Sequence, residues 1–286
     1  MKNIDRATVI GTGLVGTSVA LALRKGGIEV RLRDHNPHAV EEAVLLGAGQ
    51  PLTAADPPAD LVVLAVPPAA VARVLHDAQR AGLGRYFTDV ASVKAPVVAA
   101  AAAYGCDLAG FVPGHPMAGG EQAGPGAARA DLFLGRTWAL CPTPEVSPEA
   151  LATVRAAAEL AGAVPYELPP ECHDRAVAVV SHLPHVVSSA VAARLAEADS
   201  SALRLAGAGV RDVTRVAAGD VPLWLDILGH NAAPVADAIE ALVDDLRGAA
   251  AALRAGAGNP AERAHAVASL LRRGNDGRRR LIAELG

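Results

Sequence analysis

The run Gly11-Thr12-Gly13-Leu14-Val15-Gly16 constrains the fold more than any other feature of this 286-residue sequence. It follows an apolar run, Ala7–Ile10, and opens a helical pattern. A G-x-G-x-x-G string between a strand and a helix is typical of the phosphate-binding turn of a Rossmann unit, in which the glycines permit a tight turn and close backbone approach. We expect the N-terminus of this helix to bind the pyrophosphate of a dinucleotide. The residues expected around it are Gly11, Gly13, Leu14, Val15 and Gly16.

Short β-rich runs alternate with helical patterns over roughly the first 165 residues, which predicts an α/β fold with a doubly wound, parallel sheet. The expected strands are Ala7–Ile10, Ile28–Arg33, Leu61–Val66, Tyr86–Val90, Leu108–Val112, Thr137–Cys141 and Val164–Leu168. The expected helices are Leu14–Lys25, Pro37–Leu46, Ala69–Arg80, Val93–Tyr104 and Ser147–Ala161.

The pattern changes after Leu168-Pro169-Pro170, where strand signals give way to helical periodicity. The helical stretches expected there are Cys172–Ala198, Leu223–Leu246 and Pro260–Leu285. We therefore predict a Rossmann domain over residues 1–168 and an all-helical domain over residues 169–286.

An acidic residue, Asp34, follows the second strand at about the distance of 20 residues from the glycine motif at which an acid binds the adenosine ribose. Because a carboxylate there would repel a 2′-phosphate, the sequence favours NAD over NADP. Arg31 and Arg33 leave NADP as an alternative. Val66, at the carboxyl end of a neighbouring strand, is also expected at the cofactor.

Composition excludes several functional classes. The formal charge is −4, from 26 Lys and Arg against 30 Asp and Glu, which disfavours a nucleic-acid partner. Cys106, Cys141 and Cys172 form no C-x-x-C pair, which argues against a zinc cluster and a disulfide framework. The charged N-terminus and the lack of an 18-residue apolar run predict a soluble, cytoplasmic protein with no membrane partner.

Two candidate catalytic residues follow the fourth and fifth strands. In a doubly wound sheet the carboxyl ends of the strands open into the ligand crevice, so we expect Ser92 and His115 beside a nicotinamide. A neutral imidazole could take the proton of a substrate hydroxyl as hydride leaves the same carbon, with Ser92 orienting it. The alternatives are a structural role for His115, an N-cap role for Ser92 on the helix Val93–Tyr104, and a solvated Lys94 in its first turn.

The helical half offers candidates for substrate binding. Ser181 and His185 lie one turn apart and share a helix face, with Pro184 as a possible cause of a kink instead. No H-E-x-x-H pattern accompanies the histidines, so no metal is expected. Arg215 is suited to hold a carboxylate through two parallel hydrogen bonds, or it forms a surface salt bridge instead.

Five motifs, GTGLVGTS, DVASVK, GHPMAGGE, SHLPH and RDVTRVA followed by PLWLDI, resemble those of the prephenate/arogenate dehydrogenase family, in the same order and to about Asn231. The resemblance implies that His115 accepts the proton of the ring hydroxyl, that Ser92 assists it, and that Arg215 binds the ring carboxylate. It implies a homodimer formed through the helical domains. The residues that it places around the substrate side chain are Ser181, His185, Glu121 and Trp224. Val210 and Ala91 depart from the family pattern.

The implied activity is NAD-dependent oxidative decarboxylation of prephenate to 4-hydroxyphenylpyruvate in tyrosine biosynthesis. Arogenate and a ring-amino analogue of prephenate remain alternative substrates, and a non-catalytic NAD-binding sensor is an alternative class. Another two-domain hydroxyacid dehydrogenase would rely on a lysine from the helical half, but the lysines here are Lys2, Lys25 and Lys94.

Overall fold

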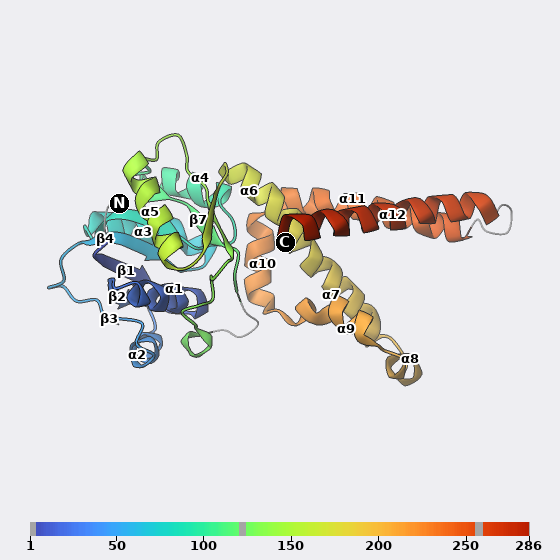
Figure 1. Ribbon diagram of the computed structural model, residues 1–286, viewed down its shortest axis with the longest axis horizontal. Coiled ribbons are helices and arrows are strands. Elements are labelled where there is room, and N and C mark those ends of the chain that lie inside the picture. The colour runs from blue at the N-terminus through green and yellow to red at the C-terminus, as the bar shows by residue number, and fades with distance from the viewer. Residues whose placement is uncertain (1–3, 120–123, 255–259, 286) are drawn as a thin grey trace. The chain divides into compact units, whose positions relative to one another are not determined.

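The computed structural model describes residues 4–119, 124–254 and 260–285 (Figure 1). The chain divides into two compact units, residues 1–232 and residues 233–286. Each unit is described by itself below. The expected domain boundary after Leu168 stays a prediction.

The first unit contains a parallel sheet in the order β3-β2-β1-β4-β5-β6. Its strands are β1 Arg6–Ile10, β2 Glu29–Arg33, β3 Gln50–Pro51, β4 Ala59–Leu64, β5 Gly84–Asp89 and β6 Phe111–Val112. The chain builds outward in one direction from β1 and in the other from β4, and the crevice at such a reversal of strand order is where doubly wound sheets bind ligands. The predicted α/β fold class is confirmed.

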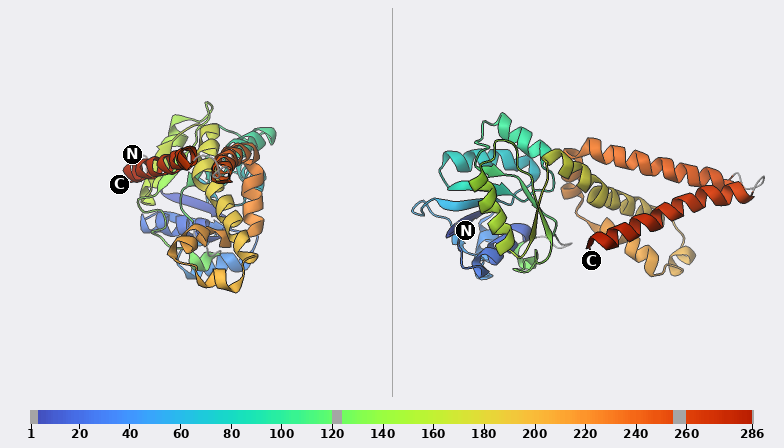
Figure 2. Two further views of the ribbon diagram at one scale, coloured as in Figure 1. Left: turned by 90° about the vertical axis from the view of Figure 1, so that its right-hand side faces the viewer. Right: turned by 45° about the horizontal axis from the view of Figure 1, so that its top comes forward.

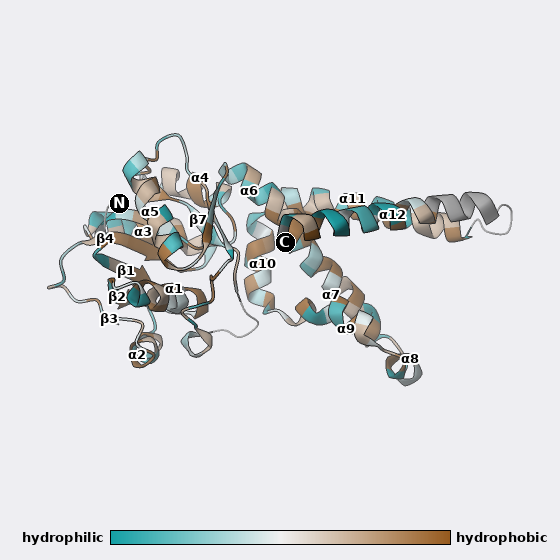
Figure 3. Cartoon of the chain, viewed as in Figure 1, coloured by the Kyte–Doolittle hydropathy of each residue, from teal (hydrophilic) through white to brown (hydrophobic). Residues whose placement is uncertain are grey.

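Helices cover both faces of this sheet (Figure 2). They are α1 Leu14–Lys25, α2 Pro37–Leu45, α3 Pro68–Arg80, α4 Ala95–Ala103 and α5 Pro148–Leu160. Side chains alternate along each strand, so Val9 and Val63 pack with α1 and α5 on one face. Ile10 and Leu64 pack with α3 and α4 on the other. This is why β4 is apolar without interruption from Leu61 to Leu64 and why β1 ends in the apolar pair Val9 and Ile10 (Figure 3).

A second, smaller sheet contains His115, which the sequence analysis expects after the fifth strand. It consists of β7 Gly114–Pro116, β8 Thr137–Leu140 and β9 Val164–Glu167, with β7 antiparallel and β9 parallel to β8. His115 lies in β7, opposite Ala139. The short turn η1, Pro125–Ala127, lies between β7 and β8 in the chain.

The predicted strand Leu108–Val112 is wrong in its first half, since only Phe111–Val112 pairs in the sheet. The Asp107 carboxylate accepts the Ala109 N–H at 2.9 Å, and the Phe111 N–H bonds the Leu108 carbonyl. These local hydrogen bonds replace the ladder.

The rest of the first unit is helical. It comprises α6 Pro170–Val177, a π-helical turn η2 Ala178–His182, α7 Leu183–Ala196, α8 Ser200–Arg204, α9 Ala208–Thr214, η3 Arg215–Ala218 and α10 Val221–His230. The predicted stretch Cys172–Ala198 is therefore helical but contains a π turn, which ends two residues before Pro184. A proline has no N–H to donate and crowds the preceding turn, and a π turn relieves that conflict. Helix α6 contacts α4, and α10 contacts α3.

The predicted stretch Leu223–Leu246 is broken at Asn231, where α10 ends and α11 Ala232–Arg254 begins. Asn231 leaves helical geometry with φ −122° and ψ 31°, and its buried side chain donates to the Asp174 carbonyl at 2.8 Å. In the second unit, α11 and α12 Pro260–Leu285 lie side by side (Figure 1). Arg273 of α12 pairs with Asp245 of α11 at 2.5 Å.

Within the described part of the chain, one helical stretch, Pro170–Ala196, is long and apolar enough to cross a membrane by length and composition. A single stretch of this kind is weak evidence for a span, because core helices pass the same test. His173, Asp174 and His182 of this stretch are buried and hydrogen-bonded within the first unit.

Candidate active site

The three glycines of the first turn are there for different physical reasons. Gly11 has φ +103°, and a Cβ there would lie 2.1 Å from the Ala65 carbonyl oxygen. A Cβ on Gly16 would lie 1.9 Å from the Gly11 carbonyl oxygen, so this glycine lets α1 pack on the turn. A Cβ on Gly13 would meet nothing within 4 Å. The turn is therefore tight on the protein side and open at the α1 N-terminus, which fits a dinucleotide pyrophosphate.

A cavity of about 470 Å³ adjoins this turn and fits the adenosine half of the cofactor. Gly11, Asp34 and Val66 line it together with Arg33. The Asp34 carboxylate accepts hydrogen bonds from the Thr12 N–H at 2.6 Å and the Thr12 hydroxyl at 3.1 Å. Burial raises the pKa of Asp34, but these bonds and one from the Asn36 N–H outweigh it and hold the pKa below its usual range. The residue is thus a charged acceptor suited to the ribose hydroxyls.

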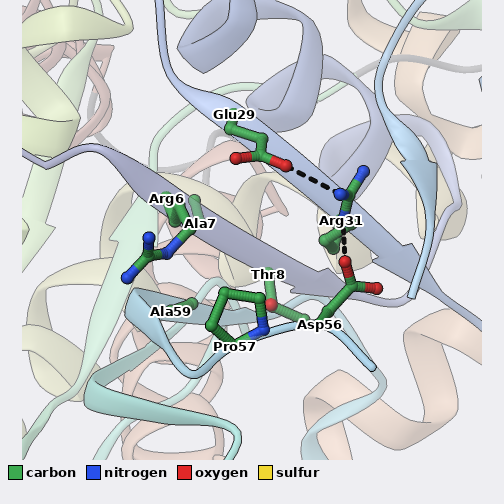
Figure 4. Close-up of a pocket in the computed structure, with 8 residues that line it drawn as sticks. All are labelled: Arg6, Ala7, Thr8, Glu29, Arg31, Asp56, Pro57 and Ala59. Carbon is green, nitrogen blue, oxygen red and sulfur yellow. Dashed lines mark hydrogen bonds and ion pairs between the residues drawn. The ribbon is translucent and has the colours of Figure 1, made fainter. Parts of the chain in front are cut away.

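The two arginines of β2 have different surroundings. Arg31 lies between Glu29 and Asp56, at 2.7 Å from each, beside a pocket of only about 10 Å³ (Figure 4). It does not line the adenosine cavity, whereas Arg33 does. Only Arg33 is therefore placed to meet a 2′-phosphate.

A larger cavity, about 820 Å³, brings four of the predicted substrate-binding residues together. They are Ser181, His185, Arg215 and Trp224. Leu14, the first residue of α1, lines the same cavity, so the cavity extends to the glycine turn. Arg129, which the sequence analysis did not single out, also lines it and supplies a second guanidinium.

The His185 and Trp224 rings form one wall of this cavity and stack with centroids 3.5 Å apart and planes 10° apart. Burial lowers the pKa of His185, which favours a neutral ring. A Cβ on Gly219 would lie 2.5 Å from the Trp224 Nε1 atom and 2.8 Å from His185 Cε1. The wall therefore requires glycine at that position.

His115 lies in a buried polar network next to the sheet. Its Nδ1 atom is 2.8 Å from Nε2 of His173, whose own Nδ1 is 2.8 Å from the Asp174 carboxylate. The residue as a whole is half-buried, and burial of its ring, together with His173, Lys94 and His182, lowers the pKa of His115 well below the usual 6.5. A ring that stays neutral is ready to accept a proton. His115 does not appear in the lining of the 820 Å³ cavity, and neither does the half-buried Ser92 between β5 and α4.

Two alternatives from the sequence are wrong. Helix α4 begins at Ala95 with Lys94 at its N-cap, so Ser92 does not cap it. Lys94 is fully buried, not solvated, and its ammonium group donates to the Asp89 carboxylate and, at 2.6 Å, to the Gly114 carbonyl. The cap comes instead from Asp174, which accepts the Lys94 and Ala95 N–H groups at 2.8 Å each.

The sequence analysis missed His173, Asp174, Asn231 and Arg129. The remaining predicted site residue, Glu121, lies outside the described residues.

A dinucleotide cradle with an acid at the ribose position, a neutral imidazole on strand β7 of the second sheet and a cavity lined by arginines define an NAD-dependent dehydrogenase of an anionic substrate. Two family models match the chain. One, described as the nucleotide-binding domain of prephenate dehydrogenase, covers residues 19–167, and the other, described as the dimerization domain of prephenate dehydrogenase, covers residues 169–266. The chain belongs to the prephenate dehydrogenase family.

Individual relatives agree with this assignment. The chain is 42% identical to the probable prephenate dehydrogenase NovF of Streptomyces niveus, over 98% of this chain and 78% of the relative. It is 30% identical to the cyclohexadienyl dehydrogenase of Zymomonas mobilis, over 86% of this chain and 88% of the relative.

Solved structures are similar along nearly the whole chain. The prephenate dehydrogenase of A. aeolicus, in complex with hydroxyphenyl propionate and NAD⁺, has a TM-score of 0.85 at 27% identity and covers 98% of this chain and 99% of its own. The Synechocystis arogenate dehydrogenase has a TM-score of 0.79 at 27% identity, over 96% and 99%. The predicted family and cofactor, NAD, are confirmed.

Proposed function

We propose that this protein catalyses the NAD-dependent oxidative decarboxylation of prephenate to 4-hydroxyphenylpyruvate. The observation that carries the proposal is the single cavity that joins the glycine turn at Leu14 to Arg215 and Trp224. A substrate in it can contact the nicotinamide end of the cofactor and a guanidinium at the same time.

The roles of the residues follow from the chemistry of prephenate, a dianion with a ring hydroxyl at C4 and two carboxylates at the opposite end. NAD supplies the hydride acceptor. As hydride leaves C4, His115 takes the hydroxyl proton, the C1–CO₂ bond breaks, and its electron pair completes the aromatic ring. Aromatisation leaves negative charge on the C4 oxygen, which takes the proton back from His115. The products are therefore 4-hydroxyphenylpyruvate, CO₂ and NADH, and His115 ends the reaction neutral. Ser92 orients the imidazole or the hydroxyl.

Two arginines match two carboxylates. Arg215 is assigned to the ring carboxylate. Arg129, which lines the same cavity and also pairs with Asp131 at 3.2 Å, is assigned to the pyruvyl carboxylate. Ser181, His185 and Trp224 surround the side chain, together with Glu121.

Prephenate is preferred here to arogenate because of the charge of the cavity. Among the described residues that line it are two arginines and no carboxylate. An ammonium group in place of the keto group would meet no carboxylate among these lining residues; its candidate counter-charges are Asp131, which pairs with Arg129 at 3.2 Å, and Glu121. Arogenate remains the second candidate.

The test follows NADH formation by its absorbance, with prephenate and arogenate in separate assays. We expect turnover with prephenate, and His115→Asn is expected to lower kcat by about 10²-fold or more while NAD still binds. Turnover with arogenate alone would replace the proposed substrate, and no turnover with either would refute the function.

We also propose a cytoplasmic homodimer formed through the helical part. The matched dimerization domain supports this, as do exposed apolar side chains such as Leu205, Val221 and Leu225 on α8–α10. Sedimentation equilibrium is expected to give twice the mass of the chain, and a monomer at micromolar concentration would contradict the proposal.

A further inference from the structure

We infer that His173 and Asp174 are positioning residues that fix the tautomer of His115 and hold its ring for proton transfer. This inference rests on the proposed role of His115 as the base. Neither residue lines the 820 Å³ cavity, and neither takes part in hydride transfer.

The geometry is a chain of three groups that runs inward from the sheet to helix α4. His115 Nδ1 is 2.8 Å from His173 Nε2, and His173 Nδ1 is 2.8 Å from the Asp174 carboxylate. The two imidazole rings meet edge to face, with centroids 5.1 Å apart and planes 69° apart. His173 and Asp174 are only 2% and 4% exposed, so water does not compete for these hydrogen bonds.

The direction of hydrogen bonding follows from the Asp174 end. Both oxygens of its carboxylate already accept N–H groups at the N-terminus of α4, from Lys94 and Ala95, so the group acts as an acceptor toward His173. His173 must therefore carry its proton on Nδ1 and present the lone pair of Nε2. That lone pair requires a proton on Nδ1 of His115, which leaves Nε2 of His115 as the free acceptor for a substrate hydroxyl.

The backbone of Asp174 is also held in place by a hydrogen bond. The Asn231 side-chain amide donates to the Asp174 carbonyl at 2.8 Å, and Asp174 belongs to a helix that contacts α4. The carboxylate thus stabilises the imidazolium that forms when His115 takes the proton, through one intervening ring. The other charged or titratable groups near His115 are Lys94, paired with Asp89, and His182.

The principal test is Asp174→Asn, which removes the charge. With the amide nitrogen in the place of Oδ1, it presents an N–H to His173, keeps the oxygen acceptor for the Ala95 N–H and loses the acceptor for the Lys94 N–H. A donor there reverses both rings, and it leaves Nε2 of His115 protonated. We expect kcat with prephenate to fall by about 10²-fold, with the KM for NAD unchanged. Because the lost carboxylate no longer stabilises the imidazolium, the acid limb of the pH profile of kcat/KM is expected to move to lower pH.

A second variant, His173→Phe, leaves the α4 cap intact and removes only the ring that links His115 to Asp174. A similar loss of kcat is expected, and the double variant should lose little more than the worse single variant. Thr153→Val is the matched control: it removes a buried hydroxyl of α5 that bonds only the Glu149 carbonyl. It should lower stability without moving the acid limb.

A spectroscopic measurement keeps the inference separate from the proposed function. Nitrogen-15 NMR of histidine-labelled enzyme is expected to show His115 protonated on Nδ1 in the wild type and on Nε2 in Asp174→Asn. If wild-type enzyme turns over prephenate but both variants match it, or if Asp174→Asn loses rate with an unmoved acid limb and an unchanged tautomer, the positioning role is refuted. If wild-type enzyme does not turn over prephenate, the proposed function fails. The tautomer measurement still decides whether His173 and Asp174 fix the tautomer of His115.

Discussion

The buried ring of His182 makes a sharp prediction about the acid stability of the protein. The side chain is 1% exposed, and its Nδ1 atom lies 3.1 Å from the Asn231 amide nitrogen. That amide also donates to the Asp174 carbonyl, which fixes its orientation and makes it a donor toward His182. A protonated Nδ1 would place two donors against each other, so the folded protein requires a neutral ring.

The expected magnitude follows from the pKa. Burial is the main cause that lowers the pKa of His182 from 6.5 to about 4, with His173 and His185 adding to it and Asp174 opposing it. Between these values the unfolded chain binds a proton that the folded protein does not, so stability falls as the pH drops below 6.5 and the loss is complete near 4. Each pH unit in this window is worth about 1.4 kcal/mol, so His182 alone costs about 2 kcal/mol between pH 7 and pH 5.

The assay is urea unfolding, followed by circular dichroism at pH 7, 6 and 5, on wild-type protein and His182→Gln. Glutamine can accept the Asn231 amide through its carbonyl and does not titrate. Other titrating groups contribute equally to both proteins, so the free energy of unfolding of the wild type should fall by about 2 kcal/mol more than that of the variant. Parallel pH dependences would show that His182 is not held neutral, and the reasoning would be wrong.

Three further outcomes test the buried ion pair, the cofactor site and the substrate site. Lys94→Met should lower the free energy of unfolding by about 3–5 kcal/mol in urea titrations, because it leaves Asp89 buried without its partner. Adding Asp89→Asn should recover part of that loss, and a double variant less stable than the single one would contradict the pairing. Asp34→Ser should raise the ratio of kcat/KM for NADP to that for NAD by about tenfold or more, since Arg33 lines the same cavity and a repelling charge is gone; an unchanged ratio would exclude Asp34 as the discriminator. Arg215→Ala should raise the KM for prephenate by about 10- to 10²-fold with a smaller change in kcat, and an unaltered KM would remove it from the carboxylate site.

Sequence patterns predicted the parts of the fold whose causes are local. The glycine turn, the alternation of strand and helix, and the Asp34 position all depend on residues within about 20 positions of one another. Helix α1 begins and ends at the predicted residues, Leu14 and Lys25. Boundaries failed where a distant residue intervened, as at α4, which begins two residues later than expected because its N-terminus is capped by Asp174.

In the site, too, the residues within local motifs were predicted and those held by distant contacts were not. Single motifs located Ser181, His185 and Arg215 well enough that one cavity contains all of them. The positioning residues His173 and Asp174 were not predicted, because nothing in the sequence of their own helix distinguishes them from an exposed polar pair. Their partners lie 58 residues away at His115 and 80 residues away at Lys94.

One signal could have found these two residues. The carboxylate of Asp174, in a helix that opens with Pro169-Pro170, has only the neighbouring His173 ring as a local donor, so a buried position requires further donors from elsewhere. The free N–H groups of α4 are such donors, since the helix has no side-chain cap of its own. Helix α4 and helix α6 each lack what the other supplies, and that mutual requirement places Asp174 and, through it, His173 against the strand that carries His115. The orientation of the proposed base is therefore a consequence of how two helices satisfy their ends.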